Sequence, residues 1–104
     1  MTVVSVYVIF ADIEEARAIG RKVIEERLAA CVNILGEVES VYRWRGAIET
    51  SNEVAAIFKT GEAVADALMQ RIALLHSYEV PCVTSWPIDK VLGSYASFVE
   101  DSVT

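Results

Sequence analysis

The chain has 104 residues, with 15 Asp or Glu and 9 Lys or Arg, so its formal net charge is −6. This length fits a single domain spanning residues 1–104, and the acidic balance disfavours nucleic acid or an anionic membrane as a partner. One histidine and two cysteines are too few for a closed zinc site within one chain. Apolar residues make up 54% of the chain, above the level of about 45–50% in ordinary domains, so we expect a partner that covers part of this surface.

The sequence predicts neither a membrane span nor a secretory signal. Its longest apolar run, Val6–Ala11, is far shorter than the roughly 20 residues that cross a bilayer, and the first residues lack the basic region of a signal peptide. Cys31 and Cys82 lie far apart and are expected to be reduced thiols that behave as small apolar side chains. These features predict a cytoplasmic protein.

The first predicted elements are a strand and a helix. Residues Val3–Phe10 are rich in β-branched and aromatic side chains, which is typical of a buried strand. Asp12 and Glu15 have the spacing of a capping box. From Ile13 to Cys31 the apolar residues recur at steps of three and four, which predicts one helical stripe, after which an extended pattern restarts at Cys31.

A long hairpin is predicted next. The extended segment from Cys31 continues to Trp44, with Gly36 as a candidate bend or bulge. Arg45-Gly46 is a plausible hairpin turn, and the chain returns through two extended stretches that end at Lys59. Alternation along the first strand of this hairpin places Val38, Ser40, Tyr42 and Trp44 on one face.

The last third of the chain predicts a second helix, a short strand and a terminal helix. Thr60 is a candidate cap for a helix whose apolar stripe runs from Val64 to Leu75. Residues Val80–Trp86 have an extended pattern, and Pro81 suits the start or the edge of a strand. Asp89 is a candidate cap for the last helix.

This order of elements predicts an α/β (α+β) fold. Two βαβ units followed by a helix are typical of the ferredoxin-like βαββαβ sandwich, in which helices cover one face of the sheet. The other face would expose large side chains, and an exposed apolar face favours oligomerisation. The residues expected there are Tyr7, Tyr42, Trp44, Ile57 or Phe58.

The segment His76–Cys82 has the highest density of side chains that could bind a metal or take part in catalysis. It combines the single histidine with Glu79 and a thiol, which are groups that copper or zinc can use as ligands. The alternatives are a histidine that caps a helix C-terminus and a nucleophile–base pair of His76 with Ser77 or Cys82. The first strand is not followed by the glycine-rich loop of a phosphate-binding site.

Two long segments, Glu26–Ile34 at a helix-to-strand junction and Ser40–Glu49 with the pattern S-x-Y-x-W-x-G-x-I-E, form recognisable motifs. Both resemble motifs of the CutA divalent-cation tolerance proteins. Residues His76–Pro81 resemble the family segment H-P-Y-E-V-P, with Ser77 in place of the proline. Phe10 and Leu75 stand where some copper-binding members carry Cys and His. The resemblance covers nearly the whole chain.

The resemblance implies a ferredoxin-like protomer in a compact trimer, similar in architecture to the PII signalling proteins. It also implies tolerance of divalent cations, a possible copper-binding role and no established enzymatic activity. We expect His76 to contact the metal, with Glu79 and Cys82 as helpers. The cleft between subunits is expected to be lined by Tyr42, Trp44, Lys59, Tyr78 and Tyr95.

The leading hypothesis is a homotrimeric module for metal-ion tolerance that binds a metal or a small ligand and is not an enzyme. The alternative is an adaptor or signalling trimer that binds a small ligand or a partner protein without metal. From the residues alone, aromatic side chains at strand spacing fit a core or an interface as well as a ligand cleft.

Overall fold

A four-stranded antiparallel sheet with the strand order β2-β3-β1-β4 forms the centre of the computed structural model, which describes all residues from Met1 to Thr104. The predicted ferredoxin-like order of elements, with a helix after it, is confirmed. The elements are β1 (Val3–Phe10), α1 (Ile13–Glu25), β2 (Cys31–Trp44), β3 (Ala47–Gly61), α2 (Glu62–Leu75), β4 (Val83–Pro87) and α3 (Gly93–Ser102).

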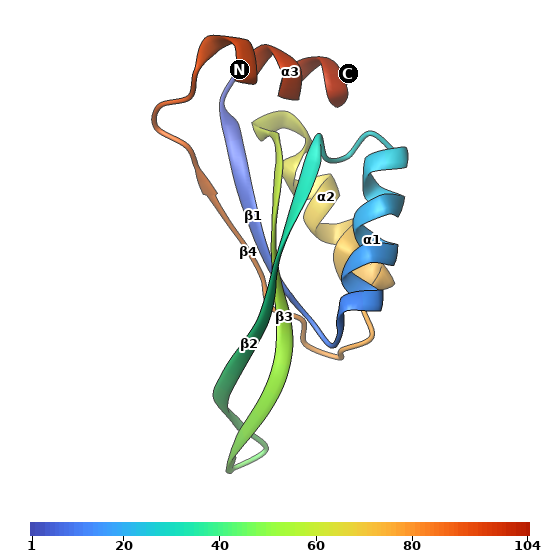
Figure 1. The fold of residues 1–104 in the computed structure, drawn as a ribbon, viewed down its shortest axis with the longest axis vertical. Coiled ribbons are helices and arrows are strands. Elements are labelled where there is room, and N and C mark those ends of the chain that lie inside the picture. The colour runs from blue at the N-terminus through green and yellow to red at the C-terminus, as the bar shows by residue number, and fades with distance from the viewer.

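The helices lie asymmetrically on the sheet. Figure 1 shows α1 and α2 on one face, α3 across one end, and the β2–β3 hairpin projecting past the helices at the other end. The molecule measures 45 × 26 × 22 Å, and the hairpin lies along the long axis. None of the three helices is long and apolar enough to cross a membrane.

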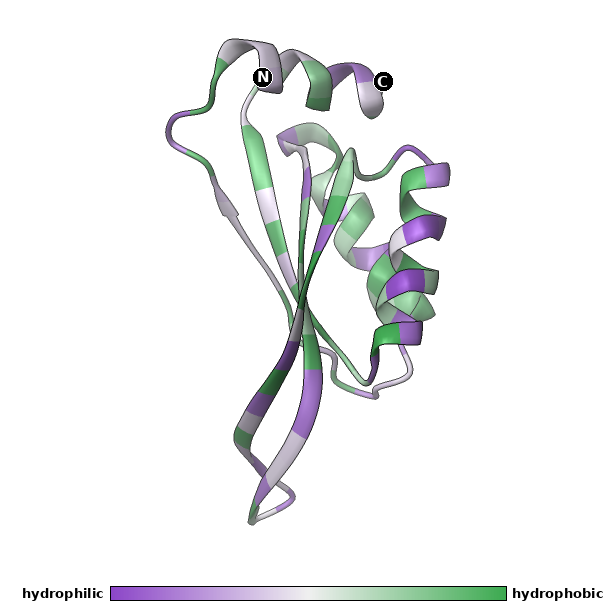
Figure 2. Cartoon of the chain, in the orientation of Figure 1, coloured by the Kyte–Doolittle hydropathy of each residue, from purple (hydrophilic) through white to green (hydrophobic).

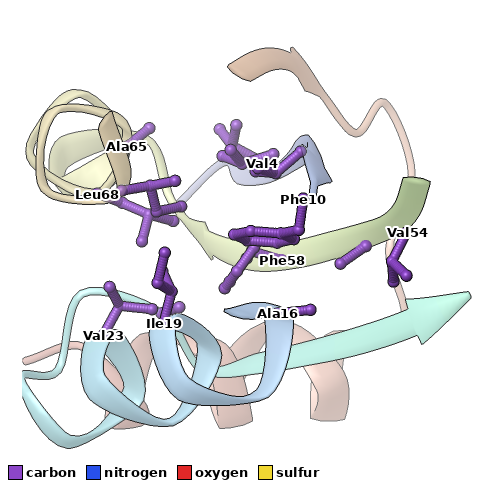
Figure 3. Packing of buried hydrophobic residues seen from close by; sticks show 14 residues of the cluster. Val4, Phe10, Ala16, Ile19, Val23, Val54, Phe58, Ala65 and Leu68 are labelled. Carbon is purple, nitrogen blue, oxygen red and sulfur yellow. The ribbon is translucent and has the colours of Figure 1, made fainter. Parts of the chain in front are cut away.

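The core lies between the sheet and the two covering helices. Every second residue of β1 enters it, and Phe58 of β3 is completely buried with its ring packed near that of Phe10, the ring centroids 6.3 Å apart. Burying a phenylalanine side chain contributes roughly 1.5–3 kcal/mol. Figure 3 shows these side chains packed against α1 and α2, whose core residues are Ala16, Ile19, Val23, Ala65, Leu68 and Ile72.

Phe58 was expected as a candidate for the exposed face of the sheet, and this expectation is wrong. Phe58 pairs with Val6 of β1 and Val32 of β2, and all three side chains pack in or against the core. Because strand side chains alternate, the half-buried Ile57 faces the other side.

The predicted cap of α1 is confirmed. The Asp12 carboxylate accepts a hydrogen bond from the Glu15 backbone N–H at 2.8 Å, and Glu15 Oε1 accepts from the Ala11 N–H at 3.1 Å. The helix ends at Glu25, earlier than the apolar stripe predicted. Arg27 has a φ of 60°, which turns the chain out of the helix toward β2.

The other two predicted caps are wrong. Strand β3 continues to Gly61, so Thr60 stays within the sheet and its hydroxyl donates to the Leu28 carbonyl at 2.8 Å. Helix α3 begins only at Gly93, after Leu92, so Asp89 lies in the connecting segment. Neither α2 nor α3 has a side-chain cap. Strand β4 also begins later than predicted, at Val83.

The hairpin has the predicted bulge and turn. The β2–β3 register shifts between Ile34 and Gly36, and Gly36 has a φ of 109°. At the tip, Arg45 and Gly46 have φ values of 49° and 85°, as a two-residue turn with both φ values positive requires. Figure 2 shows apolar and polar residues mixed along the projecting hairpin, where Val41 is 65% exposed and Ile48 69% exposed.

Candidate functional site

A cavity of about 700 Å³ lies beside the outer part of the hairpin, and we call it the hairpin cleft. Three parts of the chain form its walls: the end of β1, the β2–β3 hairpin, and the segment between α2 and β4. Its lining includes the side chains of Tyr42, Arg43, Trp44, Glu53, Tyr78, Glu79 and Cys82.

The strand pattern explains how the aromatic wall arises. Tyr42 and Trp44 are two positions apart on β2 and therefore face the same side. Glu53 of β3 pairs directly with Val38, which shares that face, so its carboxylate is presented to the same side of the sheet. The Tyr42 hydroxyl is 2.7 Å from the Ser51 hydroxyl across the strand pair. The aromatic residues predicted for a ligand cleft on β2 thus lie in the hairpin cleft.

A buried carboxylate and a tyrosine hydroxyl form the inner polar contact of the cleft. Glu53 is only 7% exposed, and the Tyr78 hydroxyl donates to its Oε2 at 2.6 Å. Burial raises the pKa of Tyr78 strongly, and the hydrogen bond to Glu53 raises it further. Tyr78 therefore remains a protonated donor at neutral pH, and it links the α2–β4 segment to β3.

His76 lies behind the cleft with both ring nitrogens engaged. Its side chain is fully buried, its ring stacks on Phe10 with centroids 5.3 Å apart, and Nε2 is 2.8 Å from the Ile9 carbonyl oxygen. Nδ1 is 3.1 Å from the Tyr78 backbone nitrogen. A carbonyl only accepts and an amide only donates, so Nε2 carries the proton and Nδ1 accepts. His76 is also the C-cap residue of α2, which is the structural role considered from the sequence.

The three predicted metal contacts are not arranged to hold an ion. Glu79 and Cys82 line the cleft, but neither nitrogen of His76 has a free lone pair. Burial raises the pKa of the Cys82 thiol and the nearby Glu53 adds to the rise, which disfavours the thiolate that binds metals. No group of three or more His, Cys, Asp and Glu side chains in the chain could hold a metal ion. The residues of one chain therefore do not fit the metal that the resemblance implies.

The same contacts bear on a nucleophile–base pair. A base needs a nitrogen that can take a proton from Ser77 or Cys82, and His76 Nδ1 already accepts from the Tyr78 N–H. The Ser77 backbone N–H donates to Glu15 Oε2 at 2.9 Å. These contacts give His76 a structural role in positioning the segment that follows α2.

Two of the predicted cleft residues lie elsewhere in the protomer. Lys59 pairs with Cys31 across β2 and β3, and the Cys31 thiol is 3.3 Å from the Tyr95 hydroxyl of α3. This hydrogen bond, together with burial, raises the pKa of Tyr95 to about 12. Lys59 is six positions beyond Glu53 on β3, or roughly 20 Å at the usual strand rise. Lys59 and Tyr95 could therefore share a cleft with Trp44 only across two chains.

An ion pair that sequence reasoning missed crosses the mouth of the cleft. Arg45 Nη2, at the hairpin tip, is 3.1 Å from Glu79 Oε2, and the Arg45 guanidinium lies 5.2 Å from the centre of the Trp44 ring. Both charged side chains are more than two thirds exposed, at 73% and 70%. The sequence places Arg45 in a turn but does not indicate a partner 34 positions away.

Comparison with known proteins gives consistent matches. A family model described as CutA1 divalent ion tolerance protein matches residues 4–102. The divalent-cation tolerance protein CutA of Thermotoga maritima is 41% identical over 98 residues, which cover 94% of this chain and 96% of that protein. The protein of the same name from Archaeoglobus fulgidus is 33% identical over 98 residues, covering 94% and 95%.

Solved structures agree with these relatives. The crystal structure of CutA1 from Oryza sativa has a TM-score of 0.95 and 36% identity, and the match covers 100% of this chain and 95% of that one. The crystal structure of CutA from Xylella fastidiosa has a TM-score of 0.95 and 31% identity, covering 98% of both chains. The likeness extends over the whole fold, including the long hairpin.

Proposed function

Because this chain belongs to the CutA1 divalent ion tolerance family, we propose that it acts in divalent-cation tolerance as a homotrimeric binding module. Its ligand site is the hairpin cleft. The observation that carries this proposal is the cleft itself, which combines three aromatic side chains with a buried carboxylate. Ligand sites are typically concave, largely apolar and equipped with a few fixed polar groups.

Exposed apolar residues and open sheet edges support the trimer. Trp86 is 44% exposed and Phe98 48% exposed, in addition to the apolar residues of the hairpin. Strands β2 and β4 are the two edges of the sheet, and unpaired edges invite pairing with another chain. A contact between the β2 edge of one copy and the β4 edge of the next is heterologous, so it closes a ring if the rotation allows.

Sedimentation at micromolar concentration tests the assembly. The proposal expects a species of three times the 11.4 kDa chain mass, whereas a species of one chain mass would overturn it. The experiment is informative about the cleft as well, because Lys59 and Tyr95 can reach it only from a neighbouring chain.

The metal part of the proposal concerns Glu79 and Cys82. They are the predicted ligands that face the cleft, and a deprotonated cysteine sulfur is a ligand for both Cu(I) and zinc. Because one chain offers no complete ligand set, a bound ion needs donors from a second chain. His76 acts by holding the segment that carries both residues.

Titration of Cu(II) and Zn(II) by calorimetry tests this assignment. Cys82→Ser and Glu79→Gln are expected to weaken binding, while His76→Gln, checked for folding by circular dichroism, is expected to weaken it less. Equal affinity of the wild type and all three variants would contradict the placement of the metal in the cleft.

An adaptor or signalling module without metal is the second candidate. The incomplete ligand set and the aromatic wall favour it, because they suit an organic ligand better than an ion. A thermal-shift screen of small molecules, run with and without a chelator, separates the two candidates. Hits that persist in the chelator support the second candidate, and hits that disappear support the first.

A further inference from the structure

A positive charge already lies at the mouth of the hairpin cleft. The Arg45 guanidinium is held between the Trp44 ring, at 5.2 Å, and the Glu79 carboxylate, at 3.1 Å. An aromatic face and a carboxylate on either side of a cation are the two elements of a binding site for organic cations. The chain's own side chain therefore shows which chemistry this position accepts.

The interior of the cleft also favours a positively charged ligand. Glu53 is almost completely buried and its Oε2 accepts from Tyr78; Oε1 has no protein donor and is open to the cleft, since no buried side-chain oxygen of the chain lacks a partner. A buried carboxylate is costly unless a donor or a cation is near it. Tyr42 and Tyr78 add aromatic surface, and Arg43 is the one cationic residue in the wall. Within one chain the cleft thus combines aromatic faces and two carboxylates with Arg43 in its wall and the displaceable Arg45 at its mouth.

Arg45 is held weakly enough to be displaced. The Arg45 and Glu79 side chains are both largely exposed, and exposed ion pairs are weak because water screens them and the side chains lose rotational freedom. The residue lies in the two-residue turn at the tip of the hairpin. Its side chain can move into solvent without disturbing the strand pairing behind it.

We propose that the hairpin cleft binds a small organic cation, an alkylguanidinium or a primary alkylammonium ion, which replaces the Arg45 guanidinium between Trp44 and Glu79 and directs its charge toward Glu53. This inference rests on the proposed function only in taking the cleft as the ligand site. Arg45 then acts as an internal competitor that keeps the cleft mouth closed until such a ligand arrives.

A diffuse organic cation suits this site better than a bare metal ion does. Aromatic rings attract a guanidinium or ammonium group through their negative faces, whereas a transition-metal ion needs several nitrogen, oxygen or sulfur ligands at short distance. One chain has no such ligand set. A planar guanidinium can also stack on Trp44 while it pairs with a carboxylate.

Tryptophan fluorescence tests the proposal, with methylguanidinium and butylammonium as probes. The chain has two tryptophans, so the Trp86→Phe variant leaves Trp44 as the sole emitter. We expect a saturable change for both probes and none for methylurea, which is neutral and of similar shape. Absence of saturation, or an equal response to methylurea, would overturn the proposal.

Variants of the cleft sharpen the test. Arg45→Ala is expected to bind the probes about two- to fivefold more tightly, the factor set by an exposed ion pair. Arg27→Ala is the matched control, because Arg27 is also an exposed arginine with positive φ, at the end of α1. Unchanged affinity in Arg45→Ala, or an equal gain in Arg27→Ala, would contradict the role of Arg45.

Removing the groups that bind the probe is expected to weaken its affinity. In the Trp86→Phe background, calorimetry of Trp44→Leu and Glu53→Gln should show affinities at least about tenfold weaker, and Trp44→Phe should retain part of the binding. Wild-type affinity in a folded Glu53→Gln protein would sink the assignment. A monomer in sedimentation would overturn the proposed trimer, but the binding of the probes could still be measured. A protein that binds metal in calorimetry and does not bind the probes would overturn this inference and leave the proposed function in place.

Discussion

Glu15 is expected to contribute more to stability than any other surface carboxylate of α1. Its Oε1 accepts from the Ala11 N–H at 3.1 Å, and its Oε2 accepts from the Ser77 N–H at 2.9 Å. The side chain is only 14% exposed, so water screens these bonds little. In Glu15→Gln the amide keeps one acceptor oxygen but turns an NH₂ group toward the other N–H donor. Losing one hydrogen bond to a charged group costs roughly 1.5–3 kcal/mol.

Thermal unfolding at a fixed protomer concentration measures this loss. For a domain of this size a change of 1 kcal/mol shifts Tm by roughly 4–8 °C, so Glu15→Gln should lower Tm by at least about 6 °C at pH 7. The concentration is fixed because assembly makes Tm concentration-dependent. Glu14→Gln is the matched control, since Glu14 is exposed in the same first turn and loses only the interaction with the helix dipole, about 0.3–1 kcal/mol.

The pH dependence of this effect has a definite sign. Burial alone would raise the pKa of Glu15, but the hydrogen bonds from Ser77 and Ala11 outweigh burial and lower the pKa below 4.5. A carboxylate with a lowered pKa in the folded state contributes fully above 4.5, and its contribution is lost as the pH falls through the lower folded pKa. The Tm difference between wild type and Glu15→Gln should therefore shrink toward pH 3. A constant difference, or equal effects of Glu14→Gln and Glu15→Gln, would refute the reasoning.

Four further substitutions have expected outcomes in urea unfolding. Tyr78→Phe leaves the buried Glu53 carboxylate without its donor and should cost roughly 1–3 kcal/mol, while Tyr42→Phe, which loses an exposed hydroxyl pair, should cost less than about 0.5 kcal/mol. Phe58→Ala empties a fully buried position and should cost about 3–5 kcal/mol; a loss below 1 kcal/mol would mean that the core is not closed there. Gly36→Ala has space for a Cβ but a φ of 109°, so it should destabilise by about 1 kcal/mol or more through backbone strain alone, and a neutral effect would argue against the bulge.

Local sequence patterns predicted most of the helices and strands, because interactions between residues close in sequence largely determine where these elements form. The β-branched and aromatic composition of Val3–Phe10 and the Asp12–Glu15 spacing act over a few residues, and the structure has the strand and the helix cap that they predict. Thr60 fails as a predicted cap for a reason that is not local. Pairing with β1 extends β3 to Gly61, and the Thr60 hydroxyl finds its acceptor on Leu28, 32 positions away.

The sequence was sufficient to predict several side chains of the candidate site, but it was not sufficient to predict their hydrogen bonds. Tyr42 and Trp44 follow from strand alternation, and the resemblance added Tyr78. The partners of His76 are the Ile9 carbonyl and the Tyr78 amide. Both are backbone groups, which every residue carries, so no residue type in the sequence marks them as partners of an imidazole. A metal-binding histidine and a structural histidine therefore look alike until the fold is known.

The contacts of Ser77 connect these observations. A proline at position 77, as in the related motif, would stiffen the segment but would have no N–H. In this chain the Ser77 N–H donates to Glu15, which also caps α1 through Ala11. The next residues continue the connection, since His76 accepts from the Tyr78 N–H and Tyr78 donates to Glu53. The start of α1 and the interior of the cleft are thus joined through the α2–β4 segment by two bonds from backbone N–H groups and one bond between side chains. Each of these hydrogen bonds restricts the α2–β4 segment. The rigidity that a proline at position 77 would give is therefore offset by the Ser77–Glu15 hydrogen bond, which only a residue with a backbone N–H can make.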